Sequence, residues 1–509
     1  MNLILIDDMV KNILKSRVYE AAVETPLTFA PKISAETGCR VFLKREDLQP
    51  VHSFKIRGAY NKISQLNPEQ KKRGIIAASA GNHAQGVALA AQKLGISALI
   101  IMPKTTPSIK VDAVAGYGAD IELHGDNYSE ASVYCRLREK ETGRTYVHPF
   151  NDPLVIAGQG TIGKEILEQL PDVTHVFVAV GGGGLIGGIA SYIKALRPEV
   201  QVISVEPEDS SCLAASIAAG KRVELPHVGI FADGVAVKQM GDLTFDIARR
   251  LVDGCVTVTT DQVCSAIKST FEDTRSILEP AGALALAGLR KYGLSADAQA
   301  VAICSGANMT FERLQQITER TLIGSGKEAL ISVTMPERPG SLHEFCTRVV
   351  GDRSITEFSY RKGHPSDAHV LIGIAVSGDA DRAVLLEKIR HAGFGCDDLT
   401  DDDTAKEHIR HMVGGYSSSA GGEVFYEIEF PERSGALGDF LTVLNDQWNI
   451  SLFHYRTAAS DTGKVLIGFE TVENGNLEQA LNTAGYSWDC VNGKRCIHLY
   501  VSPDSVRES

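Results

Sequence analysis

Hydrophobic positions in the first three-fifths of the chain fall into short apolar runs separated by helical patterns. One such run, GIIAASA, is followed by residues 83–94, where apolar side chains recur at helical spacing. Near-continuous apolar strands separated by helices are typical of a parallel sheet covered on both faces. The pattern therefore predicts an α/β fold with right-handed crossovers. The predicted strands are residues 74–80, 97–102, 175–180, 201–205 and 300–304.

The pattern changes near residue 325, beyond which the chain repeats itself. Residues 336–345 match residues 431–440, and residues 355–361 match residues 450–456, both at an offset of 95 residues (336 to 431 and 355 to 450). Each copy runs strand, turn, helix, strand, which predicts a small α+β unit of the βαββαβ kind. The period is longer than that of solenoid repeats. A purely structural or oligomerising appendage remains the alternative interpretation of this tail. The predicted domains are residues 1–325, 326–413 and 423–505, with a glycine- and serine-rich connector at residues 414–422.

Composition and charge narrow the class of protein. The 509 residues include 51 basic and 63 acidic side chains, a net charge of −12, which argues against nucleic acid or anionic membranes as partners. Ten cysteines without a C-x-x-C pair favour reduced thiols over a disulfide framework or a zinc ribbon. The chain has neither a signal-peptide pattern at its start nor an apolar run of about 20 residues. These features predict a cytoplasmic protein.

Lys55 is the first candidate for chemistry, in the segment SFKIRGA. A lysine amine becomes a covalent catalyst when it condenses with a carbonyl, as it does with pyridoxal phosphate. Taken alone, a lysine is more often a solvated surface group. Its interpretation therefore depends on the other motifs of the chain.

A second motif, SAGNHAQG at residues 79–86, lies where a predicted strand passes into a helix. The unpaired N–H groups of such a turn offer a seat for a carboxylate. Gly81 lets the backbone come close to a ligand, and the Asn82 amide can bind a ring hydroxyl. The alternative is an ordinary helix N-terminus followed by small packing residues.

Two further motifs follow predicted strands. Gly181 to Gly184 are four consecutive glycines before Leu185, and their N–H groups can wrap a phosphate at the start of the next helix. Their spacing is not that of a dinucleotide-binding loop. Ser305, in CSGAN, can face a pyridine nitrogen at the carboxyl end of its strand. Both segments could equally be simple turns.

Taken together and in this order, the motifs resemble those of the fold-type II pyridoxal-phosphate enzymes, which include tryptophan synthase β-subunits, cysteine synthases, serine racemases and threonine deaminases. S-F-K-x-R-G-A, S-x-G-N-H-x-Q-G and the four glycines point to the serine/threonine deaminase branch, and residues 279–283 and 305–308 agree. The doubled tail is similar to the two ACT-like regulatory subdomains of biosynthetic threonine deaminases. Residues 405–415 look like the helix that connects those subdomains in the family.

The resemblance implies a role for individual residues. Lys55 would be the Schiff-base lysine, and Asn82 would contact the ring hydroxyl. The loop that grips the substrate carboxylate would include Ser79, Gly81 and His83. The remaining cofactor-binding residues would be Phe54, Gly181, Gly182, Gly183, Gly184, Leu185 and Ser305. The residues matching effector positions in the tail are Tyr360, Arg361, Tyr455 and Arg456.

The activity implied by the resemblance is deamination of L-threonine, and also of L-serine, in the first committed step of isoleucine biosynthesis. Isoleucine would inhibit and valine would activate through the tail, and the enzyme would be a homotetramer. Two positions depart from the relatives. Ser434 stands where the first repeat has Pro339, so the two effector turns are expected to differ in rigidity. Ser210 and Cys212 stand where racemase relatives carry a cation-binding pattern, so no metal is expected.

Two alternatives stay open. A serine racemase or a β-replacement synthase would use the same scaffold, although duplicated regulatory domains suit a committed pathway step better. The second is an amino-acid-sensing protein with an inactive catalytic half. The presence of Lys55, Asn82, the four glycines and Ser305 argues against it.

Overall fold

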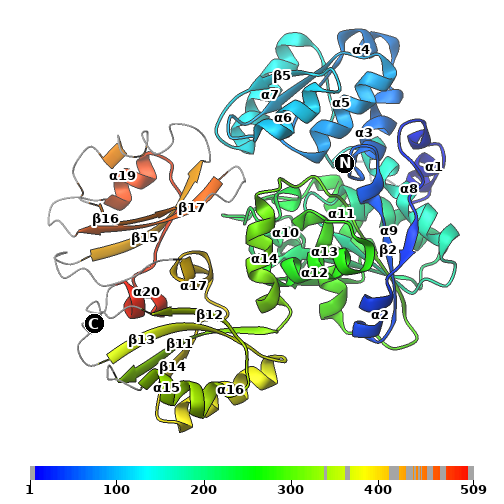
Figure 1. Cartoon of the computed structure of the whole chain (residues 1–509). Coiled ribbons are helices and arrows are strands. Elements are labelled where there is room, and N and C mark those ends of the chain that lie inside the picture. Colours follow the sequence, from blue (N-terminus) through cyan, green and yellow to red (C-terminus); the bar gives the residue numbers. More distant parts are fainter. Residues whose placement is uncertain are drawn as a thin grey trace. The chain divides into compact units, whose positions relative to one another are not determined.

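The computed structural model describes residues 6–336, 341–360, 367–411, 423–431, 440, 443–444, 448, 450–455, 462–470 and 477–501. The chain divides into two compact units, Met1–Ile317 and Thr318–Ser509 (Figure 1). In the part of the chain described here, no helix is both long and apolar enough to cross a membrane.

The first unit contains a six-stranded sheet in the order β1-β2-β10-β7-β8-β9. Its strands pair in parallel except for β1, which runs antiparallel to β2. We call this sheet and the helices packed on it the large lobe. The strands are β1 Leu27–Phe29, β2 Arg40–Lys44, β7 His175–Ala179, β8 Gln201–Pro207, β9 Gly254–Val258 and β10 Gln299–Ile303.

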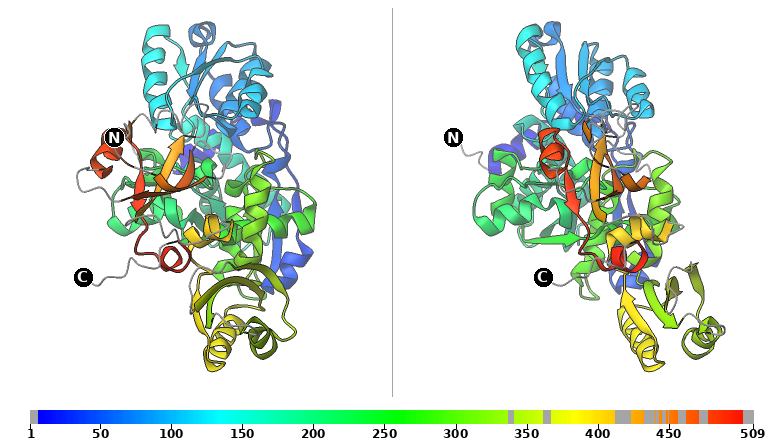
Figure 2. Two further views of the ribbon diagram at one scale, coloured as in Figure 1. Left: turned by 60° about the vertical axis from the view of Figure 1, so that its left-hand side comes forward. Right: turned by 90° about the vertical axis from the view of Figure 1, so that its left-hand side faces the viewer.

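A second, four-stranded sheet, in the order β5-β4-β3-β6, is parallel throughout. We call it, with helices α3 to α7, the small lobe; Figure 2 shows residues of about 60 to 145, in blue to cyan, gathered at one end of the unit. Its two central strands are buried at every residue, as their continuous apolar pattern predicts. The α/β prediction is therefore confirmed. The strands are β3 Ile75–Ala78, β4 Ala98–Met102, β5 Asp120–Leu123 and β6 Thr145–Tyr146.

The helices of this unit begin in two different ways. Several carry a side-chain cap: Asp152 accepts the N–H groups of Leu154 and Val155 at the start of α8. In contrast, α5 and α9 begin at Gly81 and Gly183 without any side-chain cap, which leaves their first N–H groups open. The α-helices are α1 Ile6–Leu14, α2 Pro31–Thr37, α3 Lys55–Ser64, α4 Pro68–Arg73, α5 Asn82–Leu94, α6 Ser108–Ala115, α7 Tyr128–Thr142, α8 Pro153–Gln169, α9 Gly184–Leu196, α10 Cys212–Ala219, α11 Asp242–Leu251, α12 Thr260–Thr274, α13 Pro280–Tyr292 and α14 Arg313–Gly324, which runs on into the second unit. The 3₁₀ turns are η1 Val18–Glu20, η2 Glu46–Leu48, η3 Glu208–Ser210 and η4 Asp233–Val235.

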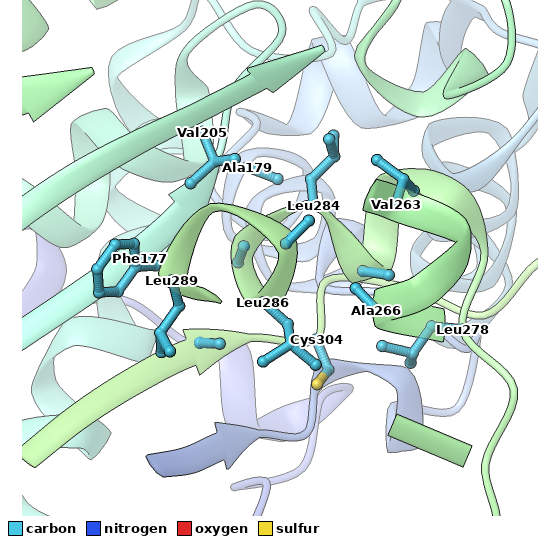
Figure 3. Packing of buried hydrophobic residues seen from close by; sticks show 14 of the residues in the cluster. Phe177, Ala179, Val205, Val263, Ala266, Leu278, Leu284, Leu286, Leu289 and Cys304 are labelled. Atoms are coloured by element: carbon cyan, nitrogen blue, oxygen red, sulfur yellow. The ribbon is translucent and has the colours of Figure 1, made fainter. Parts of the chain in front are cut away.

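The main core of the large lobe lies between helix α13 and the sheet. Leu284, Leu286 and Leu289 of this helix point toward the side chains of the neighbouring strands and of α12 (Figure 3). Gly288 allows the close packing, because a Cβ there would lie 2.3 Å from a methyl carbon of Val205. The helix is buried almost throughout because its sequence consists mainly of alanine, leucine and glycine.

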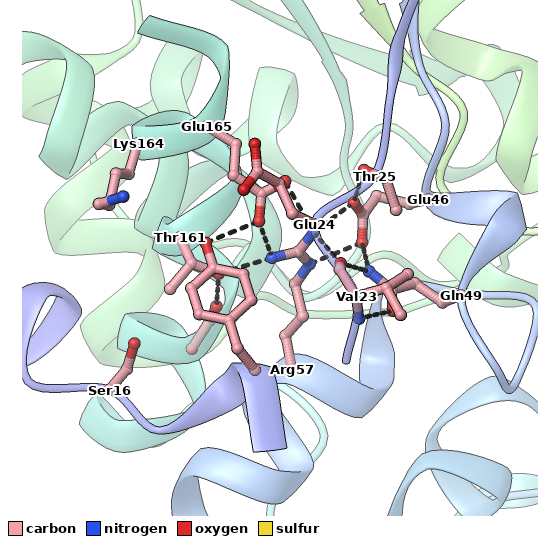
Figure 4. Close-up of polar contacts among 12 residues, drawn as sticks. Ser16, Val23, Glu24, Thr25, Glu46, Gln49, Arg57, Thr161, Lys164 and Glu165 are labelled. Atoms are coloured by element: carbon pink, nitrogen blue, oxygen red, sulfur yellow. Dashed lines mark hydrogen bonds and ion pairs between the residues drawn. The ribbon is translucent and has the colours of Figure 1, made fainter. Parts of the chain in front are cut away.

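A buried network of charges joins helix α3 to the turn η2 and to helix α8 (Figure 4). Arg57, two residues after Lys55, donates from Nε to Glu46 Oε2 at 2.8 Å and from Nη1 to Glu165 Oε1 at 2.5 Å. Lys44 Nζ lies 2.6 Å from the other oxygen of Glu165. All four side chains are fully buried or nearly so. Two cations thus face two carboxylates, which offsets the high cost of removing each charge from water.

The second unit contains two four-stranded antiparallel sheets with the same strand order, β12-β13-β11-β14 and β16-β17-β15-β18. Both contain an irregularity at one place, between Ile355 and Glu357 in the first and between Ile450 and Leu452 in the second. These positions differ by 95 residues, so the sequence repeat is confirmed as a structural one. The strands are β11 Glu328–Pro336, β12 Ile355–Tyr360, β13 Asp367–Ala375, β14 Gly395–Asp398, β15 Glu423–Pro431, β16 Ile450–Tyr455, β17 Thr462–Glu470 and β18 Trp488–Cys490.

The first repeat follows the predicted order, β11-α15-β12-β13-α16-β14. The two repeats share one apolar cluster, in which Leu330 and Leu371 of the first sheet meet Phe425 and Leu466 of the second. The connecting helix expected at residues 405–415 is short: α17 ends at Glu407, and a 3₁₀ turn follows it. Residues 412–415 lie outside the described residues. The helices are α15 Ser341–Phe345, α16 Asp379–His391, α17 Asp403–Glu407, α19 Leu477–Thr483 and α20 Arg495–Tyr500, with the π-helical turn η5 Cys346–Val350 and the 3₁₀ turn η6 Ile409–His411.

Candidate active site

The motifs singled out in the sequence meet where the two lobes join. Ser53 pairs with Gly306 in an isolated β-bridge, and Phe54 N donates to Ser305 O at 3.2 Å. On the other side of Lys55, a Cβ placed on Gly86 would lie 3.0 Å from the Lys55 backbone. The start of α3 is therefore held between the end of β10 and helix α5. Because these contacts link both lobes, the site is a product of the tertiary fold.

Lys55 is the first residue of α3 and is only partly buried. Its Nζ donates to Pro149 O at 3.2 Å and lies 5.1 Å from the centre of the Phe54 ring. The surrounding protein keeps water from the amine and lowers the pKa of Lys55 to about 8, although the nearby Glu279 carboxyl acts in the opposite direction. A lysine amine of lowered pKa is suited to act as a nucleophile and as a base.

The four-glycine loop between β7 and α9 has no space for side chains. A Cβ on Gly182 would lie 2.2 Å from the ring of Phe150, and one on Gly181 would lie 2.8 Å from the Val235 backbone. Gly183 has a φ of +86°, which favours glycine. The backbone N–H groups at the start of α9 thus have no side-chain cap. This arrangement fits a phosphate group, which binds such N–H groups and the positive end of the helix.

The start of α5 is a second place where the backbone could hold an anion. Ser79, Gly81 and Asn82 remain partly open, and a Cβ on Gly81 would meet nothing within 4 Å. His83 is buried, and its Nε2 lies 2.8 Å from Val147 O. Burial and then the Lys55 charge lower the pKa of His83 to about 3, so the ring is neutral. His83 is consequently able to serve a bound carboxylate through its backbone N–H, since its ring is engaged elsewhere.

Asn82 and Ser305 have polar partners within the protein. Asn82 Nδ2 donates to Glu279 Oε1 at 2.5 Å, and Asn308 Nδ2 donates to Asn82 Oδ1 at 2.7 Å. Ser305 is buried, and its hydroxyl donates to Ala281 O at 3.2 Å. Sequence reasoning gave no role to Glu279 or Asn308, although both belong to motifs that it noted.

Glu279 is a buried carboxyl group inside the site. Burial, and then the charge of Asp233, raise the pKa of Glu279 to about 7, while the Asn82 N–H acts in the opposite direction. A carboxyl group that is partly protonated near neutrality is a frequent feature of functional sites. The one available signal in the sequence was an acidic residue directly before Pro280, at the start of a helix.

In the segment where racemase relatives carry a cation-binding pattern, the polar side chains bind other groups of the protein. Glu206 accepts the N–H groups of Leu213 and Ala214 at 2.7 and 2.8 Å, so its carboxylate caps α10. Cys212 Sγ lies 3.5 Å from Gly181 O. Within the residues described, no group of three or more His, Cys, Asp or Glu side chains could hold a metal ion.

The expected effector positions lie at equivalent points of the two repeats. Tyr360 ends β12 and Tyr455 ends β16, so the two backbones reach the same place in their sheets. The side chains of both tyrosines, and all of Arg361 and Arg456, lie outside the described residues.

The glycine loop yields a first prediction. We expect Gly182→Ala to weaken pyridoxal-phosphate binding at least about tenfold, because the added methyl group would collide with Phe150 and push the loop away from its ligand. The measurement is the dissociation constant of the cofactor. Gly187→Ala is the matched control on α9, since a Cβ there has no neighbour closer than 3.8 Å; equal affinity in the two variants would contradict the assignment.

Comparison with known proteins agrees with this geometry. A family model described as pyridoxal-phosphate dependent enzyme matches residues 18–306. A second, described as the C-terminal regulatory domain of threonine dehydratase, matches residues 319–409 and again residues 414–501. The fold and the site thus define a pyridoxal-phosphate-dependent enzyme with a doubled regulatory tail.

Curated relatives specify the family further. The chain is 47% identical over 493 residues to the L-threonine dehydratase biosynthetic IlvA of Haemophilus influenzae, covering 96% of both chains. It is 48% identical over 489 residues to the biosynthetic, chloroplastic threonine dehydratase of Arabidopsis thaliana, covering 94% of this chain and 82% of that one. The chain belongs to the biosynthetic threonine dehydratases, a family of carbon–nitrogen lyases. The expected family, fold class, cofactor and class of enzyme are confirmed.

Solved structures match the catalytic unit. The processed threonine deaminase isoform 2 of Solanum lycopersicum aligns with a TM-score of 0.61 at 46% identity, over 62% of this chain and 93% of that one. Maize serine racemase aligns with a TM-score of 0.59 at 34% identity, over 63% of this chain and 98% of that one. The catalytic fold is therefore common to these two enzymes, and neither alignment covers more than 63% of this chain.

Proposed function

We propose that this lyase converts L-threonine to 2-oxobutyrate and ammonia at Lys55, as the committed step of isoleucine biosynthesis, and that it also accepts L-serine. The observation that carries the proposal is the Lys55 amine, which has a lowered pKa and donates to Pro149 O, next to the Phe150 that packs on the glycine loop, while the Lys55 backbone packs on α5. Of the two uncapped helix starts, the one at the glycine loop suits a phosphate, and the one at Gly81 suits a substrate carboxylate. Family membership supplies the reaction class.

The residues around Lys55 are suited to hold pyridoxal phosphate. Lys55 would bind it covalently with Phe54 alongside, Asn82 would donate to its ring hydroxyl, and Ser305 would face its ring nitrogen. The phosphate would be held by Gly181, Gly182, Gly183, Gly184 and Leu185. When bound, the cofactor accepts the electron pair released at the substrate Cα, which makes the Cα proton acidic.

Lys55 is proposed to remove that proton once the substrate has displaced it. With a pKa of about 8, roughly a quarter of the amine is neutral at pH 7.5, against about one part in a thousand for a free lysine. Ser79, Gly81 and His83 orient the substrate through the carboxylate seat. Ser305 offers a neutral hydroxyl, which does not hold the ring nitrogen protonated. This disfavours reactions that need a long-lived carbanion and leaves elimination of the β-hydroxyl group as the favoured outcome.

The serine racemase or β-replacement alternative shares the catalytic fold, as the maize enzyme illustrates. Its products, D-serine or a thioether, distinguish it from a deaminase, which releases an oxo acid and ammonia. The non-catalytic alternative is disfavoured because Lys55, Asn82, the glycine loop and Ser305 are all in place.

Regulation is part of the same proposal. We propose that isoleucine inhibits and valine opposes it, through the effector positions Tyr360, Arg361, Tyr455 and Arg456. The support is the doubled sheet, which brings the ends of β12 and β16 to equivalent positions. Such control requires that each effector bind one of two states of the enzyme more tightly. A cytoplasmic homotetramer completes the proposal, since closed symmetric assemblies are the general rule for such enzymes.

The test is 2-oxobutyrate formation from L-threonine by the full-length protein, with and without isoleucine. We expect turnover that falls with isoleucine and recovers with valine, and a chain that ends at Gly324 should keep turnover but lose both effects. Inhibition of the shortened chain by isoleucine would refute the placement of the effector sites. Absence of 2-oxobutyrate from a protein that binds the cofactor would refute the substrate.

A further inference from the structure

Three side chains that are distant in the sequence form a hydrogen-bonded row beside Lys55. Asn308 Nδ2 donates to Val51 O and to Asn82 Oδ1, both at 2.7 Å, and Asn82 Nδ2 donates to Glu279 Oε1 at 2.5 Å. The row crosses the site from the end of β10, through the start of α5, to the start of α13. It therefore connects the small lobe to the large lobe at the proposed ring hydroxyl contact.

The two ends of the row determine which way each amide points. The Val51 carbonyl can only accept, so the Asn308 atom that faces it must be the amide nitrogen. Both hydrogens of that nitrogen are then used, and the second one points at an oxygen of Asn82. At the opposite end an ionised Glu279 also only accepts, which again requires the Asn82 nitrogen on its side. The Val51 carbonyl thus fixes the orientation of both amides, and the ionised form of Glu279 agrees with it.

One of the two hydrogens on the Asn82 amide nitrogen has no acceptor among these three side chains. Asn82 Nδ2 carries two hydrogens, and one of them goes to Glu279. Since Asn82 Oδ1 is occupied by Asn308, the amide cannot rotate to present oxygen in place of nitrogen without breaking both bonds. We propose that Glu279 and Asn308 are positioning residues that lock the Asn82 amide so that its one free N–H faces the cofactor's ring hydroxyl.

The seat of Glu279 is tight enough for this role. Its backbone N donates to Gly306 O at 3.2 Å, and a Cβ on Gly306 would lie 2.4 Å from Glu279 Oε1. A Cβ on Gly282 would in turn lie 2.1 Å from Gly306 O. The carboxyl group therefore packs directly on Gly306, and Gly306 in turn packs on Gly282, which explains why this turn has no larger residue at either position. A confined acceptor fixes the direction of the bond that it receives.

The charged groups that face Glu279 come from both lobes. Asp233 raises its pKa, whereas Lys110 and Arg313 lower it, and Glu279 in turn raises the pKa of Lys55. Lys110 and Asp233 are themselves paired, with Nζ 2.9 Å from Oδ2. Because Asp233 and Lys110 are paired with each other, we assign to Glu279 the acceptance of the Asn82 N–H, which is a direct contact, rather than a contribution through net charge.

This inference rests on the proposed function, and its test is spectroscopic. An N–H donated to the ring oxygen favours the form of the lysine-bound cofactor in which that oxygen is anionic over the neutral-hydroxyl form, which absorbs at shorter wavelength. In full-length Asn308→Asp we expect the ratio of the shorter- to the longer-wavelength band to rise about fivefold at pH 7.5, the equivalent of one lost hydrogen bond. The kcat for threonine should fall about tenfold, with KM changed less than about threefold, because Asn308 belongs to neither helix start proposed to hold an anion.

Two further pairs of variants separate positioning from other roles. Glu279→Met removes the acceptor and should raise the ratio, whereas Glu279→Gln, which keeps an amide oxygen, should stay within about twofold of wild type. Asn61→Asp is the matched control. Asn61 is a fully buried asparagine of α3, whose Nδ2 donates to Leu154 O at 2.7 Å, and its variant should lose stability without a spectral change.

The outcomes are distinct. A band ratio in Asn308→Asp and Asn308→Ala equal to that of wild type, with cofactor bound, would overturn the proposal, as would equal effects of Glu279→Gln and Glu279→Met. Should one Asn308 variant not fold, the other and the Glu279 pair decide by the same ratio. Failure of the proposed function looks different, because wild-type protein would then show no lysine-dependent band at all.

Discussion

Lys55→Ala is expected to abolish turnover of L-threonine, with a loss of at least about four orders of magnitude in kcat. The substitution removes both the amine that binds the cofactor and the base that is proposed to take the Cα proton, so no other group replaces either role. The purified variant should bind pyridoxal phosphate through the glycine loop, yet lack the absorption band of the lysine-bound form. Both properties are measured on one sample, by spectrum and by 2-oxobutyrate assay.

The control for this prediction lies on the same helix. Lys62 of α3 pairs with Asp152, with Nζ 2.6 Å from Oδ2, and touches none of the proposed site residues. Lys62→Ala should keep the band and most of the turnover, because a partly exposed ion pair contributes only about 0–1 kcal/mol to stability. Appreciable turnover by Lys55→Ala, or an unchanged band, would refute the assignment of Lys55.

Arg57→Met is expected to cause the largest loss of stability, about 3–5 kcal/mol of the free energy of unfolding. The variant leaves Glu46 and Glu165 buried without the guanidinium that binds both of them. Methionine fills part of the volume but offers no hydrogen bond. Thermal unfolding of the full-length protein, followed by circular dichroism, measures the effect.

The pH dependence of this loss has a definite sign. Burial tends to raise the pKa of Glu165, but Arg57 and then Lys44 outweigh it, so the folded-state pKa is lower than usual. That contribution to stability is present above the ordinary glutamate value and is lost as pH falls through the lowered one. Without Arg57 the carboxyl groups take up protons more readily, so the difference between wild type and variant should shrink as pH falls below about 4.5. A difference that grew in acid would contradict the network.

Two controls separate the network from a general effect of losing an arginine. Arg138→Met breaks a partly exposed pair with Glu122 on the small lobe and should cost no more than about 1 kcal/mol. Combining Arg57→Met with Glu46→Gln and Glu165→Gln should recover part of the loss, because neutral amides remove the uncompensated buried charges.

The sequence alone determined those features that depend on local pattern. The strands β3, β4 and β7 were predicted within about two residues, because a strand buried on both faces must be apolar at nearly every position. The repeat at an offset of 95 residues was equally visible, since both copies form a sheet with the same strand order. Lys55 and the glycine loop were recognisable because a covalent amine and an exposed backbone require these residue types and no others.

Strands at sheet edges escaped the sequence analysis. β5 is only partly buried and mixes acidic with apolar residues, and β6 has two residues. Without burial on both faces, neither strand carries the continuous apolar pattern that revealed the central ones.

The tertiary structure decided which polar groups meet. Glu279 binds Asn82 across 197 residues of sequence, and Arg57 reaches Glu165 across 108. Phe150 closes the space beside Gly182, and the spacing of residues in the sequence does not predict this contact. Periodicity indicates whether a residue faces the core but not which partner it finds there, because the order of strands in the sheets brings distant turns together. The residue types needed for the chemistry could therefore be recognised in the sequence, whereas the hydrogen bonds that orient them were determined only by the tertiary structure.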